Sequence, residues 1–148
     1  PKDTRPAVDI ALVENADFSD WDGDLPEGWS AVDTELVSKS KDKGPDGGPV
    51  VALAAPGDDG YNTFYHILKD EKLNGGRVRA TVMVKADKAD TVVVALGFKT
   101  TSEPNDSDII RSAAHSGSGE WEEVTVDAEM PKNVREGSAQ LRIVVGFV

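Results

Sequence analysis

The chain has 148 residues, no cysteine, and 27 acidic against 16 basic residues, which gives a formal net charge of −11 at pH 7. The missing cysteines exclude disulfide scaffolds, thiolate zinc sites and cysteine nucleophiles. The negative charge argues against nucleic acid or an anionic membrane as a partner, and no apolar run approaches the roughly eighteen residues of a membrane-spanning helix, so we expect no membrane insertion. At this length we expect one domain with a single core.

Short runs of alternating apolar and polar residues, separated by turn-forming residues, recur along the whole chain. This pattern is typical of antiparallel sandwiches and barrels built from short strands. We therefore predict an all-β protein with about nine strands and no helix longer than one or two turns. Residues 1–6 are expected to be a linker or frayed arm, and residues 7–148 a single domain. The predicted strands are residues 8–13, 30–37, 50–54, 62–68, 76–85, 91–98, 109–115, 122–128 and 139–148.

Three of these strands indicate which face is buried. Residues 77–85 and 140–147 carry apolar side chains at every second position, so each has one face toward a core. Residues 92–96 are apolar at every position, which predicts a central strand covered on both faces. The predicted core rows are Val78, Ala80, Val82 and Val84 in the first strand and Leu141, Ile143, Val145 and Phe147 in the second.

Four aspartates fall between residues 17 and 24. Calcium takes six to eight oxygen ligands, and the segment begins like an EF-hand loop, but Leu25 and Ala31 stand where that loop needs Gly and Glu. It is therefore not an EF-hand. Two alternatives stay open: a solvated acidic loop, or a calcium site made of one or two of these carboxylates, Glu14 and backbone carbonyls.

Aromatic side chains are natural contacts for a sugar ring, because its C–H face stacks on a π-surface while polar neighbours bond its hydroxyls. The chain has nine aromatic residues, most of which must be core. We expect Phe18, Trp29 and Trp121 to be structural. The better ligand candidates, which flank loops or lie on a strand rich in polar residues, are Trp21, Tyr61 and Tyr65.

Residues 61–68 are ambiguous because both alternating rows contain aromatic residues. If Tyr65 and Ile67 face inward, His66 projects onto a binding face with Asn62. If Phe64 and Leu68 face inward instead, Tyr61 and Tyr65 form the stacking platform. An ordinary solvated sheet face is the alternative to both arrangements.

Four arginines lie on predicted outward rows of an otherwise acidic protein: Arg77, Arg79, Arg111 and Arg142. A cluster of planar guanidinium groups favours a ligand that carries carboxylate or sulfate, such as an acidic polysaccharide. The alternative is that these arginines pair with the surplus carboxylates as surface salt bridges.

Sequence signatures of catalysis are missing. The chain has no Gly-x-Ser-x-Gly, His-Glu-x-x-His or P-loop pattern, and His66 and His115 have no spacing that suggests a shared metal. A glycan-cleaving enzyme would need two carboxylates that face each other about 5 to 10 Å apart. We expect the protein not to be an enzyme.

Several short motifs occur in a defined order over nearly the whole chain. In this order the sequence resembles the jelly-roll carbohydrate-binding modules of the galactose-binding-like superfamily, which are appended to bacterial polysaccharide-degrading enzymes. The motifs are Asn15-Ala16-Asp17-Phe18-Ser19, Gly28-Trp29, Asn74-Gly75-Gly76 leading to Val84-Lys85-Ala86, and Gly119-Glu120-Trp121 running on to Met130-Pro131.

The resemblance implies an antiparallel jelly-roll β-sandwich that binds polysaccharide or oligosaccharide without catalysis. It also implies a secreted or cell-surface location and neighbouring domains in a longer parent chain, in agreement with a start at Pro1 without Met. Ser19 replaces a Glu that helps bind calcium in the family, which leaves Asp17 and Asp20 as substitute ligands. The rival hypothesis is a structural or adhesion domain without a sugar ligand. The expected ligand-binding residues are Trp21, Tyr61, Tyr65, His66, Arg77, Arg79 and Arg111.

Overall fold

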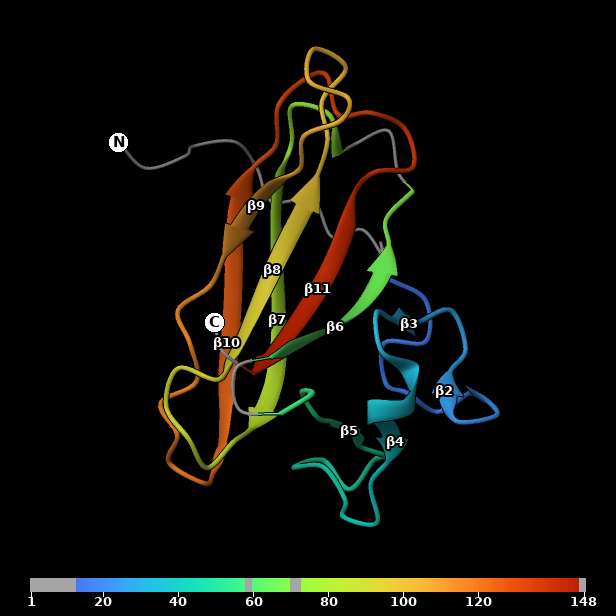
Figure 1. Ribbon diagram of the computed structural model, residues 1–148, viewed down its shortest axis with the longest axis vertical. Coiled ribbons are helices and arrows are strands. Elements are labelled where there is room, and N and C mark those ends of the chain that lie inside the picture. The colour runs from blue at the N-terminus through green and yellow to red at the C-terminus, as the bar shows by residue number, and fades with distance from the viewer. Residues whose placement is uncertain (1–12, 58–59, 70–72, 147–148) are drawn as a thin grey trace.

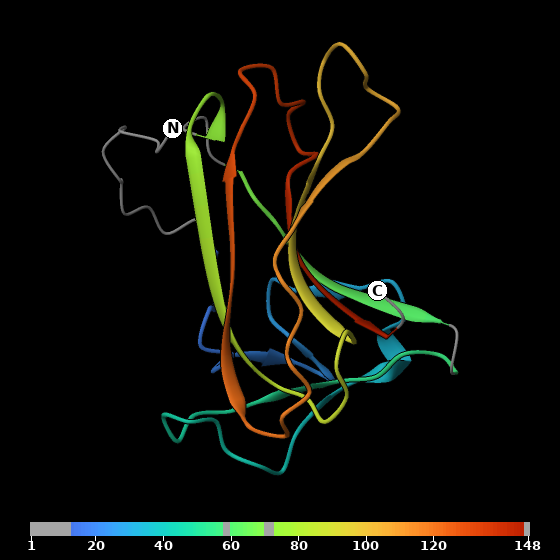
Figure 2. The same cartoon turned by 90° about the vertical axis from the view of Figure 1, so that its left-hand side faces the viewer.

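The computed structural model describes residues 13–57, 60–69 and 73–146, which contain strands β1 to β11 and one short 3₁₀ helix. Two antiparallel layers face each other: β7 and β10 form one, and β6, β11 and β8 lie in the other (Figure 2). The all-β antiparallel sandwich predicted from the sequence is confirmed. No helix within the described residues is long and apolar enough to cross a membrane.

The larger layer is a five-stranded sheet in which every neighbouring pair is antiparallel. Its central members β6, β11 and β8 lie side by side in Figure 1. In spatial order the strands are β3 (Ser30–Ala31), β6 (Tyr61–Ile67), β11 (Gln140–Gly146), β8 (Val92–Phe98) and β9 (Asp108–Arg111).

The opposite layer pairs β7 (Arg77–Lys85) with β10 (Trp121–Glu129) along their full length. Two small hairpins lie at the lower end of the molecule in Figure 1. One pairs β4 (Val37–Lys39) with β5 (Val51–Leu53), and the other pairs β1 (Trp21–Asp22) with β2 (Leu25–Pro26).

The core lies between the two layers, and the predicted apolar rows face it. Val78 and Val84 of β7 are buried, and so are the predicted inward residues of β11, apart from Phe147, which lies outside the described residues. β8 is buried at all seven positions, as expected for a central strand covered on both faces. Alternation therefore assigned these faces correctly.

An aromatic cluster fixes the orientation of β6. Trp29 stacks on Phe64 with ring centroids 4.8 Å apart, and Phe18 contacts Trp29 edge-on at 5.2 Å. Phe64 is only 1% exposed. The row of Phe64 therefore faces the core, and Tyr61 and Tyr65 lie on the outer face, which is the second of the two arrangements that the sequence left open.

The single strand predicted for residues 30–37 is wrong. After β3 the chain bends into the 3₁₀ helix Thr34–Leu36, and β4 follows. The buried side chain of Asn62 holds the bend: its Oδ1 accepts from the backbone N of Asp33 at 2.9 Å, and its Nδ2 donates to the carbonyl of Asp33 at 3.0 Å. A buried amide needs hydrogen-bond partners. The Asn62 amide finds them in the backbone of Asp33, where the chain leaves the course of β3.

Most other strand bounds agree with the prediction to within one or two residues. The strand predicted at 109–115 ends at Arg111, although Ser112 and His115 still donate backbone hydrogen bonds to β8. The β1–β2 hairpin was not predicted. Residues 1–12, which include the predicted arm and most of the strand at 8–13, lie outside the described residues.

Replacing Phe64 with Ala removes the ring that stacks on Trp29, so we expect the free energy of unfolding to fall by roughly 3 to 5 kcal/mol. Urea denaturation followed by tryptophan fluorescence measures this loss. The matched control is Tyr65→Ala, which truncates the next side chain along the strand on the opposite face and is expected to lose clearly less. Equal losses from the two substitutions would contradict the assigned faces.

Candidate functional site

The outer face of the five-stranded sheet carries a continuous row of side chains across its strands. The register aligns Ser30, Tyr65, Arg142, Ala95 and Arg111, one from each strand in spatial order. Residues that pair directly across a sheet project from the same face. The row therefore brings an aromatic ring and two guanidinium groups to one surface.

Arg142 lies at the centre of this row and is half-buried. Its Nε donates to Oε1 of Gln140 at 2.9 Å, and its guanidinium lies over Gly97 of β8 so closely that a Cβ there would be 2.5 Å from Cζ. Burial lowers the pKa of Arg142, and the nearby Tyr65 opposes this shift. Arginine nevertheless stays charged in proteins, so the row holds a fixed cation.

Tyr65 and Tyr61 both lie on this outer face, four residues apart on β6 and so about 13 Å apart along the strand. Tyr65 is half-buried beside Arg142, whereas Tyr61 is 61% exposed and lies opposite Gly146 at the other end of the strand pair. Tyr65 can therefore present a ring beside a hydrogen-bond donor. A ring beside a hydrogen-bond donor can contact both the apolar face and a hydroxyl of a sugar ring.

A cavity of about 350 Å³ lies at one end of this face. It begins at Gln140 and Arg142 and continues into the loops that follow β8 and precede β11. Its lining residues are Lys99, Ser107, Arg135, Glu136, Gly137, Ser138, Gln140 and Arg142.

His66 does not lie on this surface. It is 8% exposed on the inward row of β6, and its ring meets Trp29 edge-on at 5.2 Å. The backbone N of Glu14 donates to its Nε2 at 3.3 Å, and its Nδ1 lies 2.7 Å from the carbonyl of Ile67. The alternation that buries Phe64 also buries His66, so its predicted ligand contact is not available on the outer face.

Arg77 and Arg79 lie on β7, and thus on the outer face of the other layer rather than beside Arg111. Arg77 forms a two-pronged ion pair with Asp127 of β10, with Nε–Oδ1 and Nη2–Oδ2 distances of 2.9 and 2.7 Å. For Arg77 the salt-bridge alternative therefore describes the structure. The predicted arginine cluster is divided between two faces.

Trp21 lies on the β1–β2 hairpin and not on the five-stranded sheet. Its indole Nε1 donates to the carbonyl of Phe18 at 2.6 Å, and Nζ of Lys39 lies 5.5 Å from its ring centroid. These contacts fix the hairpin to its neighbours, away from Tyr65.

The predicted calcium ligands make local contacts. Oδ1 of Asp17 accepts from the N and Oγ of Ser19 at 3.1 and 2.8 Å, and these hydrogen bonds lower the pKa of Asp17. The backbone N and O of Asp20 bond the side chain of Asn15. The described residues contain no group of three or more Asp, Glu, His or Cys side chains that could together hold a metal ion. These side chains do not form a calcium cage, and bound calcium stays a prediction.

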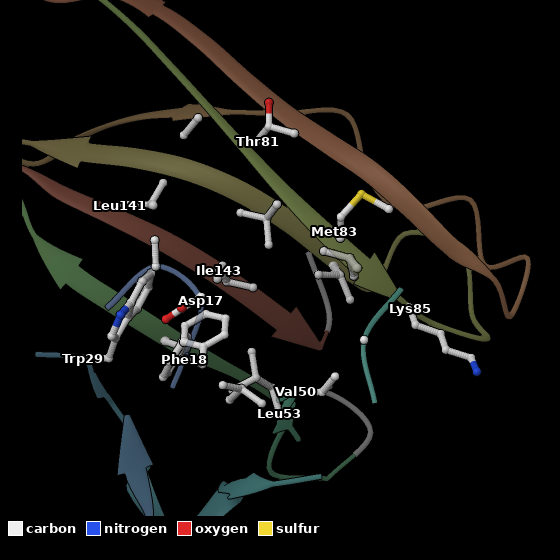
Figure 3. A pocket seen from close by; sticks show the side chains of 18 of the residues that line it. Asp17, Phe18, Trp29, Val50, Leu53, Thr81, Met83, Lys85, Leu141 and Ile143 are labelled. Carbon is white, nitrogen blue, oxygen red and sulfur yellow. The ribbon is translucent and has the colours of Figure 1, made fainter. Parts of the chain in front are cut away.

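A larger cavity of about 930 Å³ lies between β7 and the β5 region. Phe18, Leu53 and Ile143 line it, with Asp17 at its side (Figure 3). Its walls are mostly apolar, with Asp17, Thr81 and Lys85 among its polar members. We place the candidate site instead on the outer face of the five-stranded sheet, where Tyr65 and two arginines share one row.

No protein-family profile and no curated protein sequence matches the chain. Several solved structures are similar to it, including the following two. One contains the CBM22-1 and GH10 modules of endo-1,4-β-D-xylanase 10B from Clostridium thermocellum, complexed with xylohexaose. Its sequence identity to this chain is 16% and its TM-score is 0.60. The match covers 81% of this chain and 23% of that chain. The other is the enzymatically active domain of tailspike protein 4 of bacteriophage CBA120, with 14% identity, a TM-score of 0.62, and coverage of 93% of this chain and 19% of that chain.

At these identities the two likenesses show the fold alone. The chain shares its β-sandwich with a structure that holds a carbohydrate-binding module, and membership of the galactose-binding-like superfamily stays a prediction. The chain spans less than a quarter of either matched protein. Since one match includes a binding module and the other is an enzymatically active domain, the choice between binding and catalysis depends on the residues of the site.

His115 and Glu122 come together near the start of β10 with two serines, a set of residue types that occurs in hydrolases. However, Gly117 N donates to Nδ1 of His115, and its Nε2 lies 2.9 Å from the carbonyl of Glu120. Both ring nitrogens of this buried histidine are thus bonded to backbone. The hydroxyls of Ser116 and Ser118 donate to Glu122, not to the histidine. The cluster fixes a turn and lacks the serine–histidine bond of an activated nucleophile.

The serines also determine how Glu122 titrates. Hydrogen bonds from the hydroxyls of Ser116 and Ser118, and from the backbone N of Ser116, lower the pKa of Glu122 from 4.5 to about 2. Because the folded-state pKa is below the unfolded one, the unfolded chain takes up this proton first as the pH falls. The stabilisation by Glu122 is therefore complete above pH 4.5 and is lost as the pH falls toward 2.

We expect the melting-temperature difference between the wild type and Glu122→Gln to be largest above pH 4.5 and to shrink progressively toward pH 2. Circular dichroism melts from pH 6 to pH 2 measure this. Glu123→Gln, which removes the adjacent charge and leaves the serine hydrogen bonds to Glu122 in place, is the control. A difference that stays constant with pH would contradict the serine-held carboxylate.

Proposed function

We propose that the chain is a non-catalytic carbohydrate-binding module whose ligand lies on the outer face of the five-stranded sheet. The observation that carries the proposal is the juxtaposition of Tyr65 and Arg142, which pair directly across β6 and β11 with Gln140 hydrogen-bonded to the arginine. An aromatic ring next to polar side chains on the outer face of a sheet favours a sugar-binding module over a purely structural sandwich.

The contacts on this face suit the two sides of a sugar ring. The half-buried ring of Tyr65 offers a π-surface for C–H groups, while the Nη groups of Arg142 can donate to ring hydroxyls. Tyr61, farther along the same strand, provides a second ring on this face. This arrangement fits an extended oligosaccharide or polysaccharide that lies along β6.

The composition of this face supports binding without catalysis. Glycoside hydrolysis generally uses a pair of carboxylic acids, and no Asp or Glu occupies an outward position of β6, β11, β8 or β9. The outward residues, derived from the strand register, are Tyr61, Thr63, Tyr65 and Ile67; Gln140, Arg142 and Val144; Val93, Ala95 and Gly97; and Ile109 and Arg111.

In this function the module holds an attached enzyme or surface protein near its polysaccharide. The proposal includes neighbouring domains in a longer parent chain and a secreted or cell-surface location. The β-sandwich shared with a structure that contains a carbohydrate-binding module supports this role at the level of the fold.

Replacing Tyr65 with Ala removes the stacking surface, so we expect affinity for the bound polysaccharide to fall several-fold to about tenfold without unfolding. Affinity electrophoresis against a panel of neutral and acidic polysaccharides first identifies a binding polymer and then measures the variant. Circular dichroism shows whether each variant is folded.

The matched control is Met83→Ala, which truncates an exposed side chain on the outer face of the opposite layer. It should bind as the wild type does. Unchanged binding by folded Tyr65→Ala would move the site off this face. If the folded wild type binds no polysaccharide, a structural or adhesion domain becomes the better description.

A further inference from the structure

Building on the proposed sugar-binding face, we infer that its ligand is an acidic glycan, and that Arg142 binds the carboxylate of a uronic acid residue. Four observations carry this inference: the position of Arg142, its lack of an acidic partner, the glycine beneath it, and the cations around it.

Arg142 is a half-buried cation without a counterion. Among the described residues, no carboxylate lies within the 4.0 Å ion-pair distance of its guanidinium. This contrasts with Arg77, which pairs with Asp127 through two hydrogen bonds. In a chain with 27 acidic residues, an unpaired arginine at the centre of a sheet face is unexpected. Partial burial disfavours a charge that has no partner, so a bound carboxylate would compensate for this cost.

The donors of Arg142 match such a ligand. Its Nε is bonded to Gln140, which fixes the plane of the guanidinium, while its two Nη groups have no hydrogen-bond partner among the described residues. Two Nη donors in one plane can bond both oxygens of a carboxylate, and this charge-assisted geometry is stronger than bonds to neutral hydroxyls. The adjacent ring of Tyr65 can then contact the sugar that carries the acid.

Gly97 provides the space in which the guanidinium lies. A Cβ at this position would lie 2.5, 2.7 and 2.8 Å from Cζ, Nε and Nη2 of Arg142, and no other residue is among these nearest atoms. A methyl group here would therefore displace the arginine head group while leaving its charge and the backbone unchanged. Gly97 is thus a positioning residue for Arg142.

The surroundings add positive charge. Arg111 lies in the same row, one strand beyond Ala95. The cavity at the end of the face contains Lys99 and Arg135 in addition to Arg142, against a single carboxylate, Glu136. A local excess of cations on a chain of net charge −11 attracts an anionic ligand to this face, which the overall charge would otherwise repel.

The experiment compares polymers that differ only in charge. Polygalacturonate, alginate and glucuronoxylan are each tested beside the same polymer after reduction of its carboxylates to alcohols, by isothermal titration calorimetry at low and high salt. We expect at least one acidic polymer to bind about tenfold or more tighter than its reduced form, and the difference to shrink with salt.

Arg142→Gln should lose roughly tenfold to a hundredfold in affinity for the acidic polymer and little for the reduced form. Gly97→Ala, which keeps the arginine but displaces it, should lose several-fold with the same selectivity. The matched control is Arg79→Gln, the same charge change on the outer face of β7; it should bind as the wild type does. Thermal melts confirm that each variant is folded.

Each other outcome has a distinct meaning. Equal binding of acidic and reduced polymers that still depends on Tyr65 overturns the carboxylate inference and leaves the proposed function standing. Equal loss in Arg79→Gln indicates a general charge effect and also overturns it, as does preferential, Arg142-dependent binding of dextran sulfate. No binding of any polymer by the folded wild type overturns both the inference and the proposed function.

Discussion

The stacking of Phe64 on Trp29 is the contact on which the rest of the structure depends. Successive side chains of a strand point to opposite faces, so burying Phe64 sends its neighbour Tyr65 outward. The antiparallel register then places Arg142 of β11 directly beside Tyr65. A shift of one residue would put Tyr65 into the core and the buried amide of Asn62 onto the surface. The core contact and the candidate site are therefore two consequences of one register.

Much of the fold could be predicted because apolar and polar residues alternate within single strands, and this alternation is visible in the sequence. In β7 and β11 every second residue is apolar and faces the core, and these residues are buried or half-buried. The site was harder to predict because it depends on pairs. Nothing within residues 61–68 shows which row meets Trp29, and nothing near Arg77 shows that Asp127 of the neighbouring strand lies close enough to pair with it. Likewise, the bend after β3 depends on Asn62, which is distant in sequence. The local sequence pattern of a strand shows which of its faces is buried. The contacts of a single side chain depend on residues that are distant in sequence.

The glycine in β8 illustrates a signal that could have been found in the sequence but was not interpreted. Gly97 interrupts an otherwise apolar strand, and an isolated glycine in a strand often marks close approach of another group. Here that group is the guanidinium of Arg142. The sequence placed Arg142 among the outward arginines, but only the register shows that it lies over this glycine. The sequence could therefore identify Gly97 and Arg142 separately, but only the strand pairing of the sheet shows that the two residues are in contact.

The two outer faces of the sandwich differ in how their polar groups are satisfied. On the β7–β10 face, Arg77 bonds Asp127, and the hydroxyls of Thr81 and Thr125 bond each other at 2.9 Å, so donors meet acceptors within the protein. On the five-stranded face, the only hydrogen-bond partner of the Arg142 guanidinium among the described residues is the neutral amide of Gln140. A face whose donors and acceptors bond one another contributes to stability. A face whose charged donors lack acceptors within the protein is suited to a ligand that supplies them. Since similar folds serve different functions, this difference in polar satisfaction, more than the sandwich itself, supports the proposal that the larger sheet binds the ligand.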